Sequence, residues 1–200
     1  MAPFFSNAEA NGFEPKRQFR FLVSFSQFSN LQLMATKAEK PSYEISGVTE
    51  HRVLNHTFKF PGVVTWKDVK ITFIDAMDPN TGSKFWNALQ NAGYIPPTEA
   101  SSLATGVTKI SSTAALGQVK IQQLDGGSIL LPGDGDAQFT TAGSTNIREE
   151  WVLKNAFIKG VNWGALDYGT DDIVNIEVDL TYDFAQYNVM NSAAQGLAQA

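Results

Sequence analysis

The sequence contains no cysteine among its 200 residues. Disulfide bonds, thiolate metal sites and cysteine nucleophiles are therefore excluded, and thiol content gives no information about the redox compartment. Basic residues are also few: 15 Lys and Arg stand against 20 Asp and Glu, for a formal net charge of −5 and a pI of about 5.0. Because binding to nucleic acid requires a concentrated basic surface, that class of protein is disfavoured.

Long apolar runs are missing as well. None approaches the roughly 20 residues that span a bilayer. The start, MAPFFSNAEANGF, has neither the basic nor the continuous apolar region of a secretory signal. We therefore expect a soluble protein that stays where it is made. The chain is 43% hydrophobic, which is enough to bury a core, and its length suits one domain over residues 1–200.

The motifs of common active sites are absent too. The sequence has no glycine-rich phosphate loop, no nucleophile elbow and no zinc-binding H-E-x-x-H, and its only histidines are His51 and His56. The acid pairs Glu149–Glu150 and Asp171–Asp172 would suit glycoside hydrolysis only if two carboxyl groups met about 5–9 Å apart across a cleft. Adjacent acids at strand starts are more often solvated. We expect no catalytic, cofactor-binding or metal site, and no enzyme.

What the sequence does contain is alternation of apolar and polar residues, the pattern of a half-buried β-strand. It is clearest in DDIVNIEVDLTYDFAQ, residues 171–186. One side carries Val174, Ile176, Val178, Leu180, Tyr182 and Phe184, and the other carries Asn175, Glu177, Asp179, Thr181 and Asp183. The polar side is acidic and has no lysine or arginine. Further extended segments are predicted at 17–28, 30–45 with a break at Pro41, 48–60, 64–76 with a bulge near Lys67–Asp68, 117–124 and 149–160.

One segment has a helical period. In DPNTGSKFWNALQNAG, residues 78–93, Asp78 is a candidate cap, Pro79 suits the first helical position and Gly93 suits the end. Phe85, Trp86, Leu89 and Ala92 would share its apolar face. Around these elements we expect an N-terminal arm (1–15), a loop-rich insertion (94–148) and a C-terminal tail (187–200). The predicted fold is mainly β: an antiparallel β-sandwich or barrel with one flanking α-helix.

The order of these segments resembles that of a known family. The stretch EEWVLKNAFIKGVNWGALDYGTDDIVNIEVDLTYDFAQY, residues 149–187, is similar to the end of the tail tube proteins of contractile-tailed (T4-like) bacteriophages. FRFLVSF, MATKAEKP, FKFPGVVTWKDVKITFIDA and KFWNAL precede it in the order that the family shows. The Ser/Thr/Gly-rich middle and the Ala/Gln-rich tail depart from the family's pattern.

The resemblance implies a structural protein without cofactor. Its copies would form hexameric rings, join their strands in one barrel between subunits, and stack into the inner tube of a phage tail. A sheath protein would surround the tube, tape-measure protein and then DNA would occupy the lumen without specific binding, and a baseplate and a tail terminator would close the ends. Such a protein belongs to the virion tail and is assembled in the cytoplasm of the host bacterium.

Other interpretations stay open. The inner tube of a phage-derived injection or secretion system, or of a bacteriocin, is similar in fold, and fold alone does not choose among these machines. A β-sandwich carbohydrate-binding module would use exposed aromatic side chains such as Trp163 and Tyr168 as a sugar platform. A hydrolase using acids has the least support.

The acidic row suggests a role within a tube. We hypothesise that Glu177, Asp179 and Asp183 face the lumen, where carboxylates of the same sign as DNA would prevent adhesion of the passing polyanion. The alternatives are that they line the outside or pair with basic residues of a neighbouring subunit. The connection at 164–172 and both termini are candidates for contacts between stacked rings.

Overall fold

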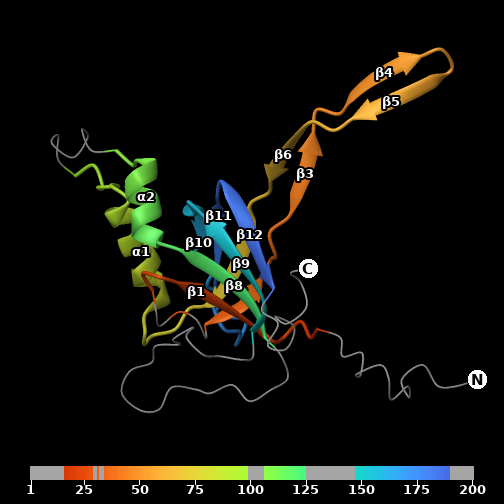
Figure 1. Ribbon diagram of the computed structural model, residues 1–200. Helices are drawn as coiled ribbons and strands as arrows, with labels where there is room; N and C mark the ends of the chain where they lie inside the picture. The colour runs from red at the N-terminus through yellow and green to blue at the C-terminus, as the bar shows by residue number, and fades with distance from the viewer. Residues whose placement is uncertain (1–15, 29–30, 32–33, 99–105, 125–146, 190–200) are drawn as a thin grey trace, which may run out of the picture.

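Two four-stranded antiparallel sheets form the body of the computed structural model, which describes residues 16–28, 31, 34–98, 106–124 and 147–189. The first sheet has the order β1 (Phe21–Phe25), β8 (Val119–Leu124), β9 (Ile147–Lys154), β12 (Phe184–Val189). The second has the order β10 (Phe157–Asn162), β11 (Asn175–Thr181), β7 (Val69–Ile74), β2 (Ala35–Ala38). The two sheets pack face to face, so the predicted antiparallel β-sandwich is confirmed (Figure 1).

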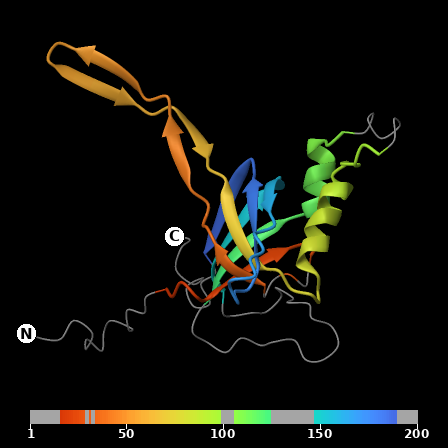
Figure 2. The same cartoon turned by 180° about the vertical axis from the view of Figure 1, so that it is seen from behind.

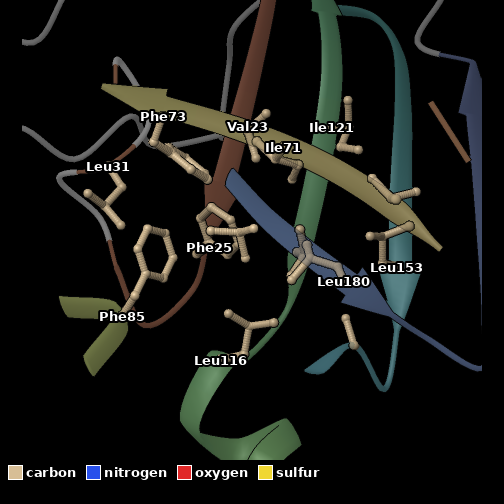
Figure 3. Close-up of a cluster of buried hydrophobic side chains, with 14 of the residues drawn as sticks. Val23, Phe25, Leu31, Ile71, Phe73, Phe85, Leu116, Ile121, Leu153 and Leu180 are labelled. Carbon is tan, nitrogen blue, oxygen red and sulfur yellow. The ribbon is translucent and has the colours of Figure 1, made fainter. Parts of the chain in front are cut away.

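The core lies between the sheets and follows the alternation in the sequence. Every second residue of β11 (Ile176, Val178, Leu180) and of β7 (Val69, Ile71, Phe73) is buried, because successive side chains of a strand point to opposite faces. Figure 3 shows Phe25, Phe73 and Phe85 meeting at one end of this core, with ring centroids 5.9 Å and 5.2 Å apart for the two pairs that include Phe73.

Two of the predicted long strands are bent and belong to both sheets. The segment predicted at 149–160 is β9 and β10, separated by Asn155, whose φ of 55° turns the chain. The segment predicted at 171–186 is β11 and β12, which part at Tyr182 and Asp183. At the bend the backbone N–H of Asp183 donates to the carbonyl of Lys154 at 3.0 Å, so both strands turn at the same place. We call the two strand pairs, β9–β12 and β10–β11, the bent ribbon.

The first helix is where the sequence places it. α1 (Thr81–Asn91) starts two residues later than the Asp78 cap would place it: Asn80 is the cap and accepts from the Ser83 N–H at 2.7 Å, and Pro79 lies before the helix. Gly93 ends it in the left-handed region, as expected, with φ 106°. Phe85, Ala88 and Ala92 are buried, whereas Trp86 and Leu89 are partly exposed at the side of the helix.

A second helix within the described residues corrects the expectation of a single flanking helix. α2 (Lys109–Leu116) lies inside the 94–148 segment that we expected to be a loop-rich insertion, and β8, which matches the strand predicted at 117–124, follows it directly. Thr108 and Ser111 cap its start reciprocally, and Gly117 ends it with φ 71°. α2 packs against α1 on one side of the sandwich (Figure 1). Neither helix, nor any other in the described parts, is long and apolar enough to cross a membrane.

The predicted tail begins too early, because Tyr187–Val189 belong to β12 and pair with β9. The N-terminal arm at 1–15, residues 125–146 of the insertion and the tail at 190–200 lie outside the described residues.

A long two-stranded hairpin projects from the body (Figures 1 and 2). It consists of β3 (Tyr43–Ser46) paired with β6 (Val63–Trp66), and further out β4 (Thr49–Val53) paired with β5 (His56–Phe60). We call residues 43–66 the projecting hairpin. The extended segment predicted at 48–60 therefore contains a turn, at Leu54 with φ 53°. The bulge expected near Lys67–Asp68 is the passage from β6 in this hairpin to β7 in the sandwich.

Candidate assembly interface

The two central acids of β11 lie on the outer face of the second sheet. The side chains of Glu177 and Asp179 are 42% and 47% exposed, and Lys70 of the neighbouring strand β7 lies between them. The Lys70 Nζ is 3.5 Å from Glu177 Oε2 and 3.8 Å from Asp179 Oδ1. The lysine that β11 itself lacks is thus supplied by the strand beside it.

A second ion pair extends this arrangement toward β10. Lys159 donates to Asp68 Oδ2 at 2.5 Å, and Thr181 donates to Asp68 Oδ1 at 2.6 Å. The hydrogen bonds from Lys159 and Thr181 lower the pKa of the Asp68 carboxyl below its usual range. On the part of the outer face formed by β7, β10 and β11, the charges are therefore paired rather than a row of free carboxylates.

Asp183 occupies a different place. It sits at the bend of the ribbon, where it accepts from Lys109 of α2 at 2.7 and 2.8 Å and from Asn155 at 2.7 Å. The hydrogen bonds from Lys109 and Asn155 lower its pKa. The structure brings Glu177 and Asp179 together around Lys70 and sets Asp183 apart as a link between α2 and the bend.

The projecting hairpin has one apolar face that the other described residues leave exposed. Cross-strand partners share a face, and the pairs Val53–His56, His51–Phe58 and Thr49–Phe60 put Val53, Phe58 and Phe60 on one side. The pairs Glu50–Lys59 and Arg52–Thr57 occupy the other side. Val53, Phe58 and Phe60 are each about half exposed, and Leu54 at the tip is 88% exposed. Nearer the body, Tyr43, Ile45 and Val64 share one face of the β3–β6 pair and are exposed as well.

Each sheet also ends in two strands that lack a further partner among the described residues. These edge strands are β1 and β12 in the first sheet and β10 and β2 in the second. An edge strand presents unpaired N–H and C=O groups, which pair readily with a strand of another chain.

The acid pair at the start of β9 is where sequence reasoning failed most. Glu149 and Glu150 were expected in solvent, yet both are 4% exposed. Glu149 accepts from Lys16, Lys40 and, at 3.1 Å, the hydroxyl of Tyr187, while Gln122 donates to Glu150 at 2.8 Å. The sequence QVKIQQL offers a signal for this burial. Glutamines in a strand beside the acids indicate that the carboxylates have polar side-chain partners rather than solvent.

The residues that the structure describes contain no group of three or more His, Asp or Glu side chains placed to hold a metal ion. His51 and His56 both lie on the outer part of the projecting hairpin. Of the two aromatic side chains considered for sugar binding, Trp163 is partly covered and Tyr168 is fully exposed.

Comparisons with known proteins give the fold a context. No protein-family model matches the chain, and no curated protein sequence is similar to it. A chain of the six-fold symmetrised baseplate of the anti-feeding prophage is 15% identical, with a TM-score of 0.58 over 88% of this chain and 97% of that one. A chain of the sheath–tube complex of the extracellular contractile injection system PVC is 16% identical, with a TM-score of 0.56 over 92% and 98%. A chain of the tube-terminating cap of the anti-feeding prophage is 16% identical, with a TM-score of 0.54 over 88% and 92%. The chain thus has the fold of subunits found in contractile injection assemblies.

Proposed function

We propose that this protein is a non-enzymatic structural subunit of the inner tube of a contractile machine, with copies joined in hexameric rings that stack into a cylinder. The observation that carries the proposal is the uncovered apolar face of the projecting hairpin. The likeness in fold to chains of contractile injection assemblies supports it.

The hairpin is built to be covered by another molecule. An isolated two-stranded ribbon is marginally stable in water, and an exposed apolar face lowers solubility. Burying a Phe side chain contributes about 2 kcal/mol, so Phe58 and Phe60 together favour association strongly. In a tube, the hairpin of one subunit would lie on a neighbouring copy.

The edge strands that lack a strand partner among the described residues fit the same assembly. If β10 of one copy pairs with β2 of the next, the second sheet continues from subunit to subunit. A sheet that closes in this way becomes a barrel without edges, and a repeated head-to-tail contact that closes gives a ring.

We further propose that the outer face of the second sheet lines the lumen, with Glu177 and Asp179 on the wall and Asp183 beside it. Lys70 and Lys159 on this face are already paired with carboxylates. A paired cation gains little from binding phosphate, so DNA or another polyanion would pass without adhering.

Two machines suit such a tube. In a phage tail, tape-measure protein and then DNA would fill the lumen, a sheath would surround the tube, a baseplate and a terminator would close it, and assembly would take place in the host bacterial cytoplasm. The alternative, the tube of a contractile injection system, is favoured by the solved assemblies to which this chain is similar in fold.

The test is assembly of the purified protein, imaged by negative-stain electron microscopy at increasing concentration. We expect rings or tubes from the natural sequence. The double variant Phe58→Asp/Phe60→Asp should raise the concentration needed for tubes by at least about 100-fold. At concentrations where both proteins are monomeric its melting temperature should be unchanged, because neither residue is in the core.

Met77→Asp is the matched control, since Met77 is also exposed but lies outside the hairpin; it should assemble normally. Tubes of normal yield from the double variant would show that the hairpin is not an assembly element. A natural protein that remains a monomer at high concentration would refute the tube itself.

A further inference from the structure

A cavity of about 650 Å³ opens where the chain enters β1. Its walls come from the segment before β1 and from β2, β8 and β9. Its size is within the usual range for pockets that hold a large side chain or a small ligand. Apolar surface is supplied by Phe19, Phe21 and Trp151.

The charge of this cavity is predominantly positive. Among the described residues, four basic side chains line it against one carboxylate, that of Glu149. Lys16 and Lys40 are engaged by Glu149. The side chains of Arg17 and Lys37 have no carboxylate partner among the described residues. The buried indole N–H of Trp151 also lacks an acceptor there, although such groups usually find one.

The connection between β10 and β11 has the complementary chemistry. Residues 163–174 carry Asp167, Asp171 and Asp172 and no basic residue. Asp167 Oδ1 accepts from the Gly169 N–H at 2.8 Å, which forms a tight turn with Tyr168 at its tip. Tyr168 is fully exposed, and Leu166 is nearly so. We call residues 163–174 the acidic loop.

Within one chain the acidic loop does not fill the cavity, because none of its residues lines it. At its foot, the Trp163 ring lies beside Gly82 of α1. The helices lie on the side of the sandwich away from the segment that enters β1 (Figures 1 and 2). The loop and the cavity are thus two different surfaces of one molecule, the requirement for a head-to-tail contact between copies.

We propose that the acidic loop of one copy docks in the cavity of the next copy. Tyr168 enters between Phe19, Phe21 and Trp151, and the carboxylates of Asp171 and Asp172 face Arg17 and Lys37. A Tyr anchored in a pocket and flanked by opposite charges is a common arrangement at the centre of interfaces. This contact rests on the proposed function, since it needs copies that assemble.

Charge reversal tests the contact. We expect Asp171→Lys/Asp172→Lys and, separately, Arg17→Glu/Lys37→Glu to raise the concentration for assembly by about tenfold or more. An equimolar mixture of the two variants should assemble again, because each reversed loop finds a reversed cavity on its neighbour and each natural loop finds a natural cavity. Restoration on mixing identifies a contact between chains, since a contact within one chain would remain mismatched.

A control variant distinguishes the contact between loop and cavity from a general attraction between two variants of opposite added charge. The variant Glu39→Lys/Asp78→Lys carries the same net charge as the loop variant but leaves the loop intact. Because its loop and cavity are both natural, it should assemble alone, and in a mixture it should leave the cavity variant out of the tubes, whereas the loop variant should bring it in. Normal tubes from both charge-reversed variants alone would overturn the loop contact and leave the tube standing. Absence of tubes from the natural sequence would overturn the tube, and this contact with it.

Discussion

At the scale of single residues, Glu149 shows how a buried acid is kept charged. Burial would raise the pKa of its carboxyl, but the hydrogen bonds from Lys16 and Lys40 outweigh burial and lower the pKa to about 2. Tyr187 adds a third donor. Because Lys16 and Lys40 lie before β1 and after β2, this one carboxylate connects the start of the chain to β9.

The lowered pKa of Glu149 predicts a specific pH dependence. Its stabilising effect is complete above the ordinary value of 4.5 and is lost as pH falls toward 2, because the unfolded chain takes up the proton first. We expect Glu149→Gln to be less stable than the natural protein by about 2–3 kcal/mol at pH 7, with the gap closing between pH 5 and about pH 2. Urea unfolding at several pH values measures it. Glu50→Gln on the projecting hairpin is the control, and a gap that does not change with pH would contradict the prediction.

At the scale of elements, the junction between α2 and β8 depends on a glycine. Gly117 has φ 71°, and a Cβ built there would lie 2.1 Å from Ser26 Oγ. Ser26 is fixed because its hydroxyl accepts from the Gln118 N–H at 2.8 Å and its own N–H donates to the Gln118 carbonyl at 3.0 Å. The helix therefore ends against the end of β1 with no space for a side chain.

We expect Gly117→Ala to destabilise the fold by about 2–4 kcal/mol, the sum of backbone strain and displacement of Ser26. Gly106→Ala is a matched control, since no atom lies within 4 Å of its Cβ position, and it should change stability by less than about 1 kcal/mol. Urea midpoints of the two variants provide the comparison. Equal midpoints would show that the junction relaxes without cost.

The elements also show what alternation in a sequence can and cannot predict. It correctly gave the buried face of β7 and β11, because side-chain period is a local property. It did not predict the bends at Asn155 and Asp183. The apolar residues keep alternating with polar ones through Tyr182, although the chain passes there from one sheet to the other. It missed α2 because KISSTAAL has few large apolar residues; only the pair Thr108 and Ser111 and the glycine at 117 mark its ends.

The lysines that pair with Glu177 and Asp183 could not be predicted from the sequence for a different reason. Lys70 is far from Glu177 in sequence, and Lys109 is far from Asp183. Strand order decides which lysine stands beside which acid, and a single sequence does not specify strand order. The exposed face of the projecting hairpin was likewise hidden, because HTFKF predicts a strand but not whether anything covers it.

At the scale of the whole molecule, the proposed lumen face has a testable surface chemistry. Glu177→Gln/Asp179→Asn removes both carboxylates beside Lys70 and frees its ammonium in every subunit. We expect tubes of this variant to retain linear double-stranded DNA in sedimentation at low salt, and to release it as salt rises. Natural tubes should retain little. If the two kinds of tube retain equal DNA, this face does not meet the polyanion.

The bent ribbon has a mechanical consequence for such a wall. Because β9 runs on into β10 and β11 into β12, two strands of each sheet form one folded strip of polypeptide that passes between the layers at two points. A force that shifts one sheet relative to the other therefore acts on the backbone at these two bends, and not only on the side-chain packing between the sheets. A subunit built this way resists separation of its two sheets when it is pushed along its length.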